Sequence, residues 1–145
     1  MTASHAPAAS RTSPLLLVGG LAVAAVASIA VNALIAVVAH ALGASDEFPP
    51  LQFGAYAFFT VLGVLAGAAG WAAVRRFSSR PAAVLRWLVP TVVAVSLVPD
   101  LLLLTSEGQP GTGVLAVVAL MAMHLAIAAI AVPIYRRVMP LPDRA

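Results

Sequence analysis

Residues 15–41 read LLLVGGLAVAAVASIAVNALIAVVAHA, an apolar run that contains no acidic residue and no arginine. A helix needs about 20 apolar residues to cross the hydrocarbon core of a bilayer, and this run is longer. A cleavable signal peptide has a shorter apolar region, of about 7 to 15 residues. The run therefore predicts an uncleaved transmembrane helix, with lipid as the medium in which the rest of the chain folds.

Three more apolar stretches follow, and each is long enough to cross a membrane as a helix. We expect these helices at about residues 53–74, 82–104 and 114–135. The prediction is an all-α fold, a four-helix transmembrane bundle with short loops, formed by one membrane domain over residues 14–137. Residues 1–13 and 138–145 are expected to be cytoplasmic tails, and the first is expected to be disordered because it is rich in Ala, Ser, Thr and Pro.

The overall composition favours the same class of protein. Hydrophobic residues make up 62% of the 145 residues and charged residues 9%. A soluble domain is about half apolar and about a quarter charged. Four spans with short loops use nearly the whole chain, so no length remains for a separate soluble domain.

The arginines fall on alternate connections between the spans. They precede the first span, join the second to the third and follow the fourth: Arg11, Arg75, Arg76, Arg80, Arg86, Arg136, Arg137 and Arg144. The other two connections carry Asp46, Glu47 and Glu107 and no basic residue. Because arginine and lysine are enriched in cytoplasmic loops, the pattern predicts both termini in the cytoplasm. The expected location is a bacterial inner (plasma) membrane.

Composition also removes several classes of function. The formal net charge of +3 does not indicate a nucleic-acid partner, because the arginines are divided among three sites beside the membrane. The chain has no cysteine and no lysine, which excludes disulfides, thiolate metal sites and Schiff-base chemistry. The P-loop, GxSxG and HExxH motifs do not occur. We expect no cofactor, no metal and no catalytic residue.

Small residues mark the helix faces that we expect to pack together. In lipid, helices associate through close contact of small residues and through hydrogen bonds between helices. Two such ridges occur: Gly20, Ala24, Ser28 and Asn32 in the first span, and Gly63, Gly67 and Gly70 in the second. We predict that the two ridges pack against each other within one chain. Dimerisation through the GxxxG pattern is the alternative.

Polar residues inside the apolar spans are the candidates for a site. At about 1.5 Å per residue, Asn32, Ser96 and His124 all lie near the middle of the membrane, and we predict a hydrogen-bonded layer of these three side chains. The simpler role is a structural clasp, in which neutral His124 pairs with the amide or the hydroxyl. The alternative is a functional site, since ionisable residues inside a membrane usually serve function.

Asp100 is the most costly residue of the spans, because a carboxylate at a helix centre costs about 2.5 to 3.5 kcal/mol to insert. It follows Pro99, which removes a backbone hydrogen bond and can open the third helix there. One interpretation is a carboxylate that reaches the outer interface. The other is a cation or proton site shared with His40, which lies at a comparable depth at the end of the first helix.

Three segments carry a family resemblance: VNALIAVVAHALG (31–43), SLVPDLLLL (96–104) and ALMAMHLAIAAIAVP (119–133). On these segments the chain resembles a family of small, uncharacterised four-span bacterial membrane proteins, a domain of unknown function found mostly in high-GC Gram-positive bacteria. The resemblance covers the chain after its N-terminal tail. It implies a membrane location and four helices, and it brings no activity, ligand or catalytic residue.

The predicted function is that of a non-enzymatic integral membrane protein, an accessory or interaction subunit. Its expected partners are the lipid bilayer and either a second copy of the chain or another membrane protein. The alternative is an oligomeric component of a small-solute, ion or proton transporter or channel that uses Asp100 and His124. An intramembrane enzyme ranks third, because His124 without a carboxylate at its own depth is a poor acid and base pair. A polar cavity that reaches the outer surface at Asp100 would favour transport, and a dry interior would favour an interaction subunit.

Overall fold

The protein is all-helical in the computed structural model, which describes residues 13–105 and 109–142; no strand occurs among them. The elements are α1 (Pro14–Ala41), the short 3-10 helix η1 (Pro49–Leu51), α2 (Phe53–Phe77), α3 (Pro81–Ser96), α4 (Val98–Leu102) and α5 (Val114–Val138). Four stretches are long and apolar enough to cross a membrane: α1, α2, α3 with α4, and α5. The predicted all-α fold of four apolar helices is confirmed.

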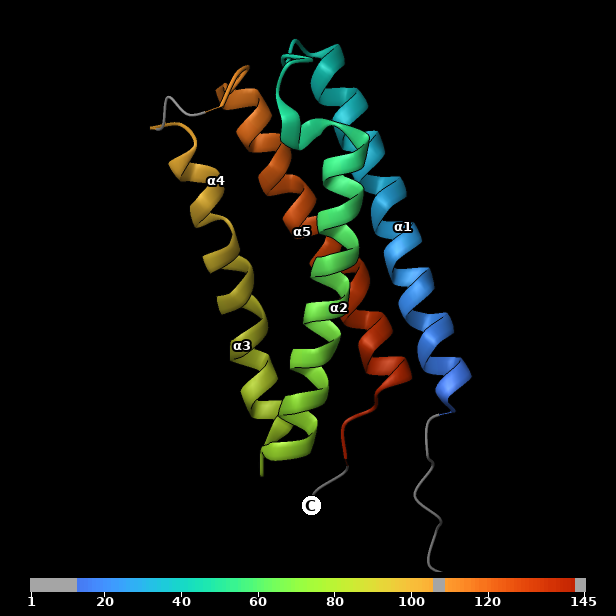
Figure 1. Ribbon diagram of the computed structural model, residues 1–145. Coiled ribbons are helices and arrows are strands. Elements are labelled where there is room, and N and C mark those ends of the chain that lie inside the picture. The colour runs from blue at the N-terminus through green and yellow to red at the C-terminus, as the bar shows by residue number, and fades with distance from the viewer. Residues whose placement is uncertain (1–12, 106–108, 143–145) are drawn as a thin grey trace, which may run out of the picture.

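The four long stretches run up and down side by side (Figure 1). Both ends of the described chain lie at the same end of the bundle as the turn between α2 and α3. We call it the arginine-bearing end, after Arg75, Arg76, Arg80, Arg136 and Arg137, which end α2 and α5 and precede α3. The opposite end, which we call the acidic end, carries Asp46 and Glu47 in the connection from α1 to α2.

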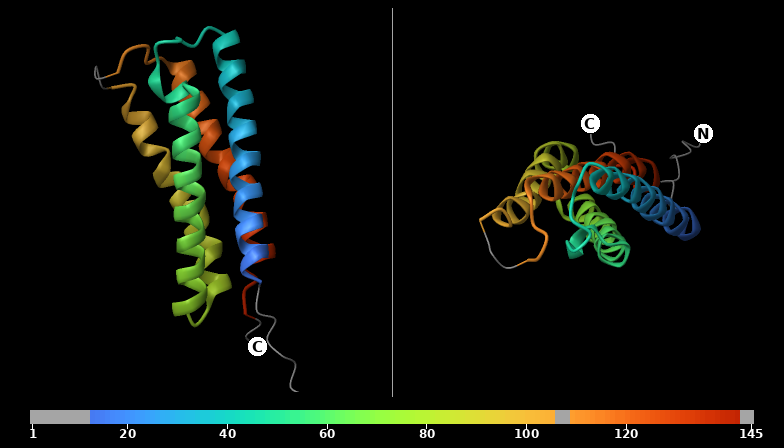
Figure 2. Two further views of the ribbon diagram at one scale, coloured as in Figure 1. Left: turned by 45° about the vertical axis from the view of Figure 1, so that its right-hand side comes forward. Right: turned by 90° about the horizontal axis from the view of Figure 1, so that it is seen from above.

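The contacts between helices are uneven. α1 makes its most extensive contact with α5, and α2 packs against both. α3 and α4, which we call the α3–α4 arm, make fewer contacts with the other helices, and the buried residues of α3 are Pro81 and Leu85. Seen from above, α5 lies between α1 and the α3–α4 arm (Figure 2). The bundle is therefore a tight group of α1, α2 and α5 with one loosely held arm.

The helix ends follow local signals in the sequence. Proline occupies the first turn of α1 and of α3, where its missing N–H is not needed. α1 ends at Ala41, two residues before Gly43, whose φ is +104°. The amides of Gly43 and Ala44 bond back to the carbonyls of His40 and Ala39 at 2.9 Å. α2 and α5 each run three residues beyond the predicted positions 74 and 135.

The third span is broken, as its proline predicted. α3 ends at Ser96 and α4 begins at Val98, so the break precedes Pro99 by two residues. Pro99 has no N–H to offer the preceding turn, and its ring disfavours an uninterrupted helix. The expected opening of the third helix near Pro99 is confirmed, and the last helical residue is Leu102 rather than 104.

The connection from α1 to α2 closes the acidic end instead of extending into solvent. Phe48 is 0% exposed and Leu51 is 2% exposed, and both belong to a cluster that includes Ala36, Ala116 and Leu120. From the sequence, we expected this connection to be a short loop at the membrane surface. A single phenylalanine in a turn has no periodicity that would indicate its burial, so this feature was missed.

Gly111, in the connection from α4 to α5, approaches this closed end closely. Its φ is +70°, and a Cβ built on it would stand 2.7 Å from Ser45 Oγ and 2.9 Å from the Phe48 backbone nitrogen. We expect Gly111→Ala to lower the free energy of unfolding by about 1 to 3 kcal/mol, because the left-handed backbone and the close contact both oppose a side chain. Thermal unfolding in detergent micelles measures the change.

Gly113→Ala is the matched control for this prediction. Gly113 has an extended backbone with φ of −158°, and a Cβ there would meet nothing within 4 Å. Its substitution should change the free energy of unfolding by less than about 0.5 kcal/mol. Equal stability of the two variants would show that the two connections do not pack together as described.

Candidate functional site

A cavity of about 890 Å³ lies between α2, the α3–α4 arm and α5. Most of its lining is apolar. Polar side chains reach it from several elements: Asn32, Tyr56, Thr60, Ser96, Asp100, Gln109, His124 and Tyr135. The cavity extends from Pro50 and Gln109 near the acidic end to Trp71 near the arginine-bearing end. It therefore runs along much of the length of the bundle.

The rim of the cavity faces the outside of the bundle. Among its lining residues, Phe59 and Leu62 of α2 are 64% and 51% exposed, and Val92 of α3 is 56% exposed. These residues belong to the membrane-spanning stretches of α2 and α3. The cavity therefore opens sideways between α2 and the α3–α4 arm, toward the hydrocarbon of a bilayer.

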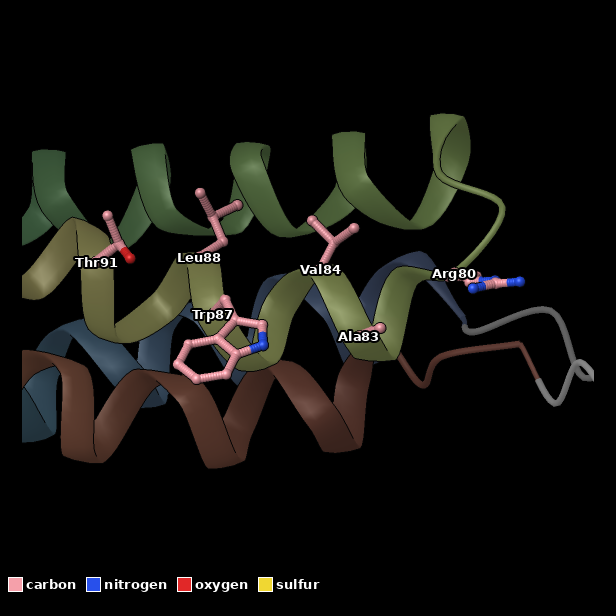
Figure 3. Close-up of a pocket in the computed structure, with 6 residues that line it drawn as sticks. All are labelled: Arg80, Ala83, Val84, Trp87, Leu88 and Thr91. Carbon is pink, nitrogen blue, oxygen red and sulfur yellow. The ribbon is translucent and has the colours of Figure 1, made fainter.

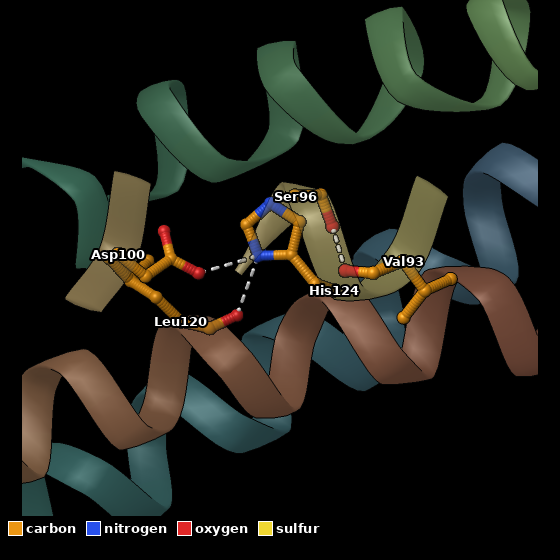
Figure 4. A network of polar contacts seen from close by, with 5 residues as sticks. All are labelled: Val93, Ser96, Asp100, Leu120 and His124. Atoms are coloured by element: carbon orange, nitrogen blue, oxygen red, sulfur yellow. Dashed lines mark hydrogen bonds and ion pairs between the residues drawn. The ribbon is translucent and has the colours of Figure 1, made fainter. Parts of the chain in front are cut away.

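Asp100 and His124 meet at the cavity wall formed by α4 and α5 (Figure 4). Asp100 Oδ2 lies 3.0 Å from His124 Nδ1. The same nitrogen lies 3.0 Å from the carbonyl oxygen of Leu120, one turn earlier in α5. A backbone carbonyl can only accept, so this geometry requires a proton on Nδ1, which is donated to Leu120. In the neutral ring, Nε2 is then an acceptor.

The same Nδ1 of His124 therefore faces two acceptors, Asp100 Oδ2 and the Leu120 carbonyl oxygen, and its contact with Asp100 is an ion pair only when the ring is protonated. Asp100 is 6% exposed, and its Oδ2 accepts no hydrogen bond from the residues that the structure describes. The break before Pro99 starts α4 beside α5, which places the carboxylate against the imidazole. A carboxylate that would be costly in lipid thus lies at a protein-lined cavity, next to a group that can carry positive charge.

Two of the sequence interpretations change with this pairing. His40 Nε2 lies 3.7 Å from Asp46 Oδ1, whose side chain is 96% exposed, whereas Asp100 lies beside His124. The second interpretation of Asp100, a site shared with His40, is therefore not what the structure shows. The reason given against an enzyme is also wrong, because His124 does have a carboxylate beside it. The depths of Asp100 and His124 were counted from helix ends that were taken to lie at one height. In the structure, α5 begins closer to the tip of the acidic end than the point where α4 ends (Figure 1).

Asn32 bonds to a residue that the sequence analysis missed. Its Nδ2 donates to Thr60 Oγ1 at 2.8 Å, and both residues are 1% exposed. Asn32 Oδ1 has no hydrogen-bond partner in the described part of the chain. Thr60 is a polar residue in the outer half of the second apolar span, which is the signal that could have found it.

The predicted layer of Asn32, Ser96 and His124 does not form as hydrogen bonds among the three. Ser96 Oγ donates to the Val93 carbonyl of its own helix at 2.7 Å, and His124 bonds to Leu120. All three residues nevertheless line the same cavity. The three residues therefore lie at one cavity, as a shared layer would require, but each has a hydrogen-bond partner other than the predicted one.

The predicted packing of two small-residue ridges is only partly correct. Ala24, Ser28 and Asn32 of α1 are buried, as expected of a packing face. The glycines have other neighbours: a Cβ on Gly20 would collide with Val138 of α5, and one on Gly67 would meet Tyr135 of α5.

Gly63 and Gly70 line the cavity, and a Cβ on either would meet nothing within 4 Å. The glycine face of α2 is therefore not packed against α1. Its missing side chains leave space for the cavity instead.

Two aromatic side chains close the cavity toward the arginine-bearing end. Tyr135 Oη donates to the Val64 carbonyl at 2.6 Å, and Trp71 Nε1 donates to the Met139 carbonyl at 3.0 Å. Their ring centroids are 6.0 Å apart. These bonds connect α5 and the segment after it to α2, so this end of the cavity is firmly tied.

A second, more open hollow of about 530 Å³ lies along the outer face of α3 (Figure 3). It runs from Arg80 to Thr91 and is otherwise lined by apolar side chains, including Trp87, which is 69% exposed. It brings together no buried polar group. In residues 13–105 and 109–142, no three His, Asp or Glu side chains gather closely enough to hold a metal ion.

Four apolar helices of membrane-spanning length, three of which wall a laterally open cavity, define a multi-pass membrane protein. Within that class, the chain belongs to the family of unknown function DUF6069, to which residues 11–140 match. No curated protein and no solved structure matches it significantly.

The Asp100–His124 contact makes a prediction about stability. His124→Leu should lower the free energy of unfolding by about 1 to 2 kcal/mol, because it leaves a buried carboxylate without its partner. The further change Asp100→Leu should restore part of the loss. A double-mutant cycle, measured by unfolding in micelles, should give a coupling of about 0.5 to 2 kcal/mol.

Ser96 supplies the control for this cycle. It lines the same cavity, but its hydrogen bond stays within α3. Ser96→Ala combined with His124→Leu should be additive within about 0.5 kcal/mol. A coupling for Asp100 as small as that for Ser96 would show that the carboxylate and the imidazole do not interact energetically.

Proposed function

We propose that the protein is a non-enzymatic integral membrane protein that takes up a small, largely apolar molecule from the bilayer and holds it in the cavity. The cavity of about 890 Å³ carries this proposal. Pockets for small molecules measure about 300 to 1,000 Å³, and they combine an apolar lining with a few convergent polar groups. Asp100, His124 and Asn32 are the polar groups of this cavity.

The open side of the cavity supports entry from the lipid. At the acidic end, the buried Phe48 and Leu51 cover α1 and α5, and the exposed Gln109 borders the cavity there. An apolar molecule dissolved in the bilayer would meet the gap between α2 and the α3–α4 arm directly. The arm makes few contacts with α2, so it can move aside at little cost.

A binding role fits the polar groups better than catalysis does. A hydrolytic site needs a nucleophile activated by the histidine, together with donors for the developing negative charge. Ser96, a hydroxyl that lines the cavity together with His124, donates to the Val93 carbonyl. The donors around His124 are committed to backbone carbonyls and are not free for a transition state.

A ligand-binding subunit and a transport component are both compatible with such a cavity. The subunit remains our first proposal, because the arginine-bearing end is tied shut by Trp71 and Tyr135. One observation favours the transport role as the second candidate: the cavity extends from Gln109 near the acidic end to Tyr135 near the other end. With only four spans, a pathway through the membrane would require more than one copy of the chain.

We infer further that the arginine-bearing end faces the cytoplasm of a bacterial inner membrane. Arg75, Arg76, Arg136 and Arg137 end the helices at the same end of the bundle as both chain ends. The acidic residues Asp46 and Glu47 lie at the other end. This charge difference is the one that orients membrane proteins.

The orientation can be checked by cysteine labelling, since the native chain has no cysteine. Asp46→Cys should react with a membrane-impermeant thiol reagent added to intact cells, because its side chain is 96% exposed at the acidic end. Ser79→Cys, in the turn between α2 and α3, should react only after the cells are opened. Labelling of Ser79→Cys in intact cells would reverse the proposed orientation.

Uptake of lipid-soluble molecules can be measured through Trp71, which lines the cavity and is 3% exposed. In a Trp87→Phe background, Trp71 is the remaining tryptophan. Its fluorescence should be quenched in vesicles of phosphatidylcholine with brominated chains, because a chain in the cavity brings bromine close to the indole. Gly63→Leu should remove most of this quenching by filling the cavity.

Gly54→Leu is the matched control for Gly63→Leu. Both glycines lie in α2 with nothing within 4 Å of a built Cβ, but Gly54 does not line the cavity. Its substitution should leave the quenching of Trp71 unchanged. If the quenching of Trp71 is equal in the Gly63→Leu and Gly54→Leu proteins, apolar chains do not occupy the cavity and the proposed function fails.

A further inference from the structure

We propose that the cavity selects an amphipathic amine, a molecule with an apolar body and a protonated amine that binds beside Asp100. This inference rests on the proposed function, because it names the head group of the molecule that the cavity holds. It follows from the hydrogen-bonding state of the polar side chains that line the cavity.

Several donors in the cavity wall are already used by the protein itself. Five of them have a partner within the protein: Asn32 Nδ2, Trp71 Nε1, Ser96 Oγ, His124 Nδ1 and Tyr135 Oη. Four of these five donate to backbone carbonyls, which hold them in place. Beside Asp100, the donors Ser96 Oγ and His124 Nδ1 are committed in this way, and the remaining donors of the lining are the hydroxyls of Tyr56 and Thr60 and the amide of Gln109.

The acceptors in the same wall are left open. Asn32 Oδ1 is buried without a hydrogen-bond partner among the described residues, and Asp100 Oδ2 is close only to His124 Nδ1, whose proton the Leu120 carbonyl also accepts; both residues line the cavity. Asn32 is 1% exposed and Asp100 is 6% exposed, so bulk water does not readily serve them. Buried acceptors without partners are costly, and a ligand that donates hydrogen bonds would relieve that cost.

Charge points to the same head group. Asp100 is the acidic residue among the lining residues, and no arginine lines the cavity within the described chain. His124 beside it is the lining group that can carry positive charge, so the negative charge of Asp100 is unbalanced while this ring is neutral. Asp46 and Glu47 lie at the acidic end, near the part of the cavity lined by Pro50 and Gln109. An anionic head would meet repulsion, whereas an ammonium group offers three donors and a positive charge.

His124 acts as a positioning residue in this arrangement. Its Nδ1 lies 3.0 Å from Asp100 Oδ2 and holds the carboxylate against α5. An amine beside Asp100 would leave the apolar tail to run along the cavity toward Trp71 at the other end. The length of the cavity therefore suits a single-chain amphiphile.

The test uses three probes with the same brominated tail: ω-bromoundecylamine, ω-bromoundecanol and ω-bromoundecanoate. Each is titrated into lipid nanodiscs that contain the Trp87→Phe protein, and the quenching of Trp71 is compared at equal density of probe in the bilayer. The amine should bind about tenfold more tightly than the alcohol, as expected for one charge-assisted hydrogen bond. The carboxylate should bind more weakly than the alcohol.

Two variants connect this preference to the proposed residues. Asp100→Asn should lower the affinity for the amine about tenfold. Asn32→Ala should lower it by a smaller factor, and it keeps the inference testable if Asp100→Asn does not fold, which thermal unfolding reports. Gly54→Leu, outside the cavity, should leave the affinities for all three probes unchanged.

The outcomes separate this inference from the proposed function. Equal quenching by the three probes, or a preference for the carboxylate, would overturn the amine inference while apolar binding in the cavity stands. Absence of quenching by all three probes would overturn both. Stronger quenching by brominated phosphatidylethanolamine than by brominated phosphatidylcholine would support the inference with a lipid amine as the source. Equal quenching by these two lipids, with the alkylamine still preferred, would support it with a free amine.

Discussion

The structure depends on how helices can adhere in lipid, where burying apolar side chains against each other brings no gain over contact with lipid tails. The close approach of small residues must therefore supply the attraction between helices. Ala36 and Ala39 of α1 share a cluster with Ala116 and Ala119 of α5, so small side chains lie on both sides of this contact. The α3–α4 arm has no comparable seam, and it is the part of the bundle with few buried residues. The cavity is the space left between the tight group and the loosely held arm.

Hydrogen bonds and one ion pair hold the walls of this space. Asn32 and Thr60 connect α1 to α2, and Asp100 and His124 connect α4 to α5. Tyr135 connects α5 to α2 through the Val64 carbonyl. Each of these contacts lies on the cavity, so the groups that stabilise the bundle also determine what the cavity offers a ligand. From the sequence, a structural role and a functional role of these polar residues looked like alternatives. In the structure, the same residues can have both roles.

Much of the fold was predictable, because each apolar span carries its own signal. Length and hydropathy indicated four helices, Gly43 indicated where α1 ends, and Pro99 indicated the break in the third span. These are local properties that need no knowledge of neighbours. The burial of Phe48 was not predictable, since it depends on the space between helices that are distant in sequence.

The candidate site was predictable in its members but not in its pairs. Asn32, Asp100 and His124 were singled out because polar groups are costly in lipid, which is a property of each residue alone. Their partners depend on the tilt and vertical offset of whole helices. Counting residues from helix ends gave His124 and Asp100 different depths, and the outward shift of α5 relative to α4 brought them together (Figure 1). Thr60 was overlooked because a hydroxyl in an apolar span carries only a weak signal.

The interruption at Leu97 gives the arm a mechanical property that the rest of the bundle lacks. Because of this break, α3 can change its tilt while α4 stays attached to α5 through the contact of Asp100 with His124. The cavity can therefore change its width along α3, while its polar groups on α1, α2, α4 and α5 keep their places. A cavity that binds as we propose would therefore discriminate sharply at the head of a guest molecule and tolerate variation in the bulk of its tail.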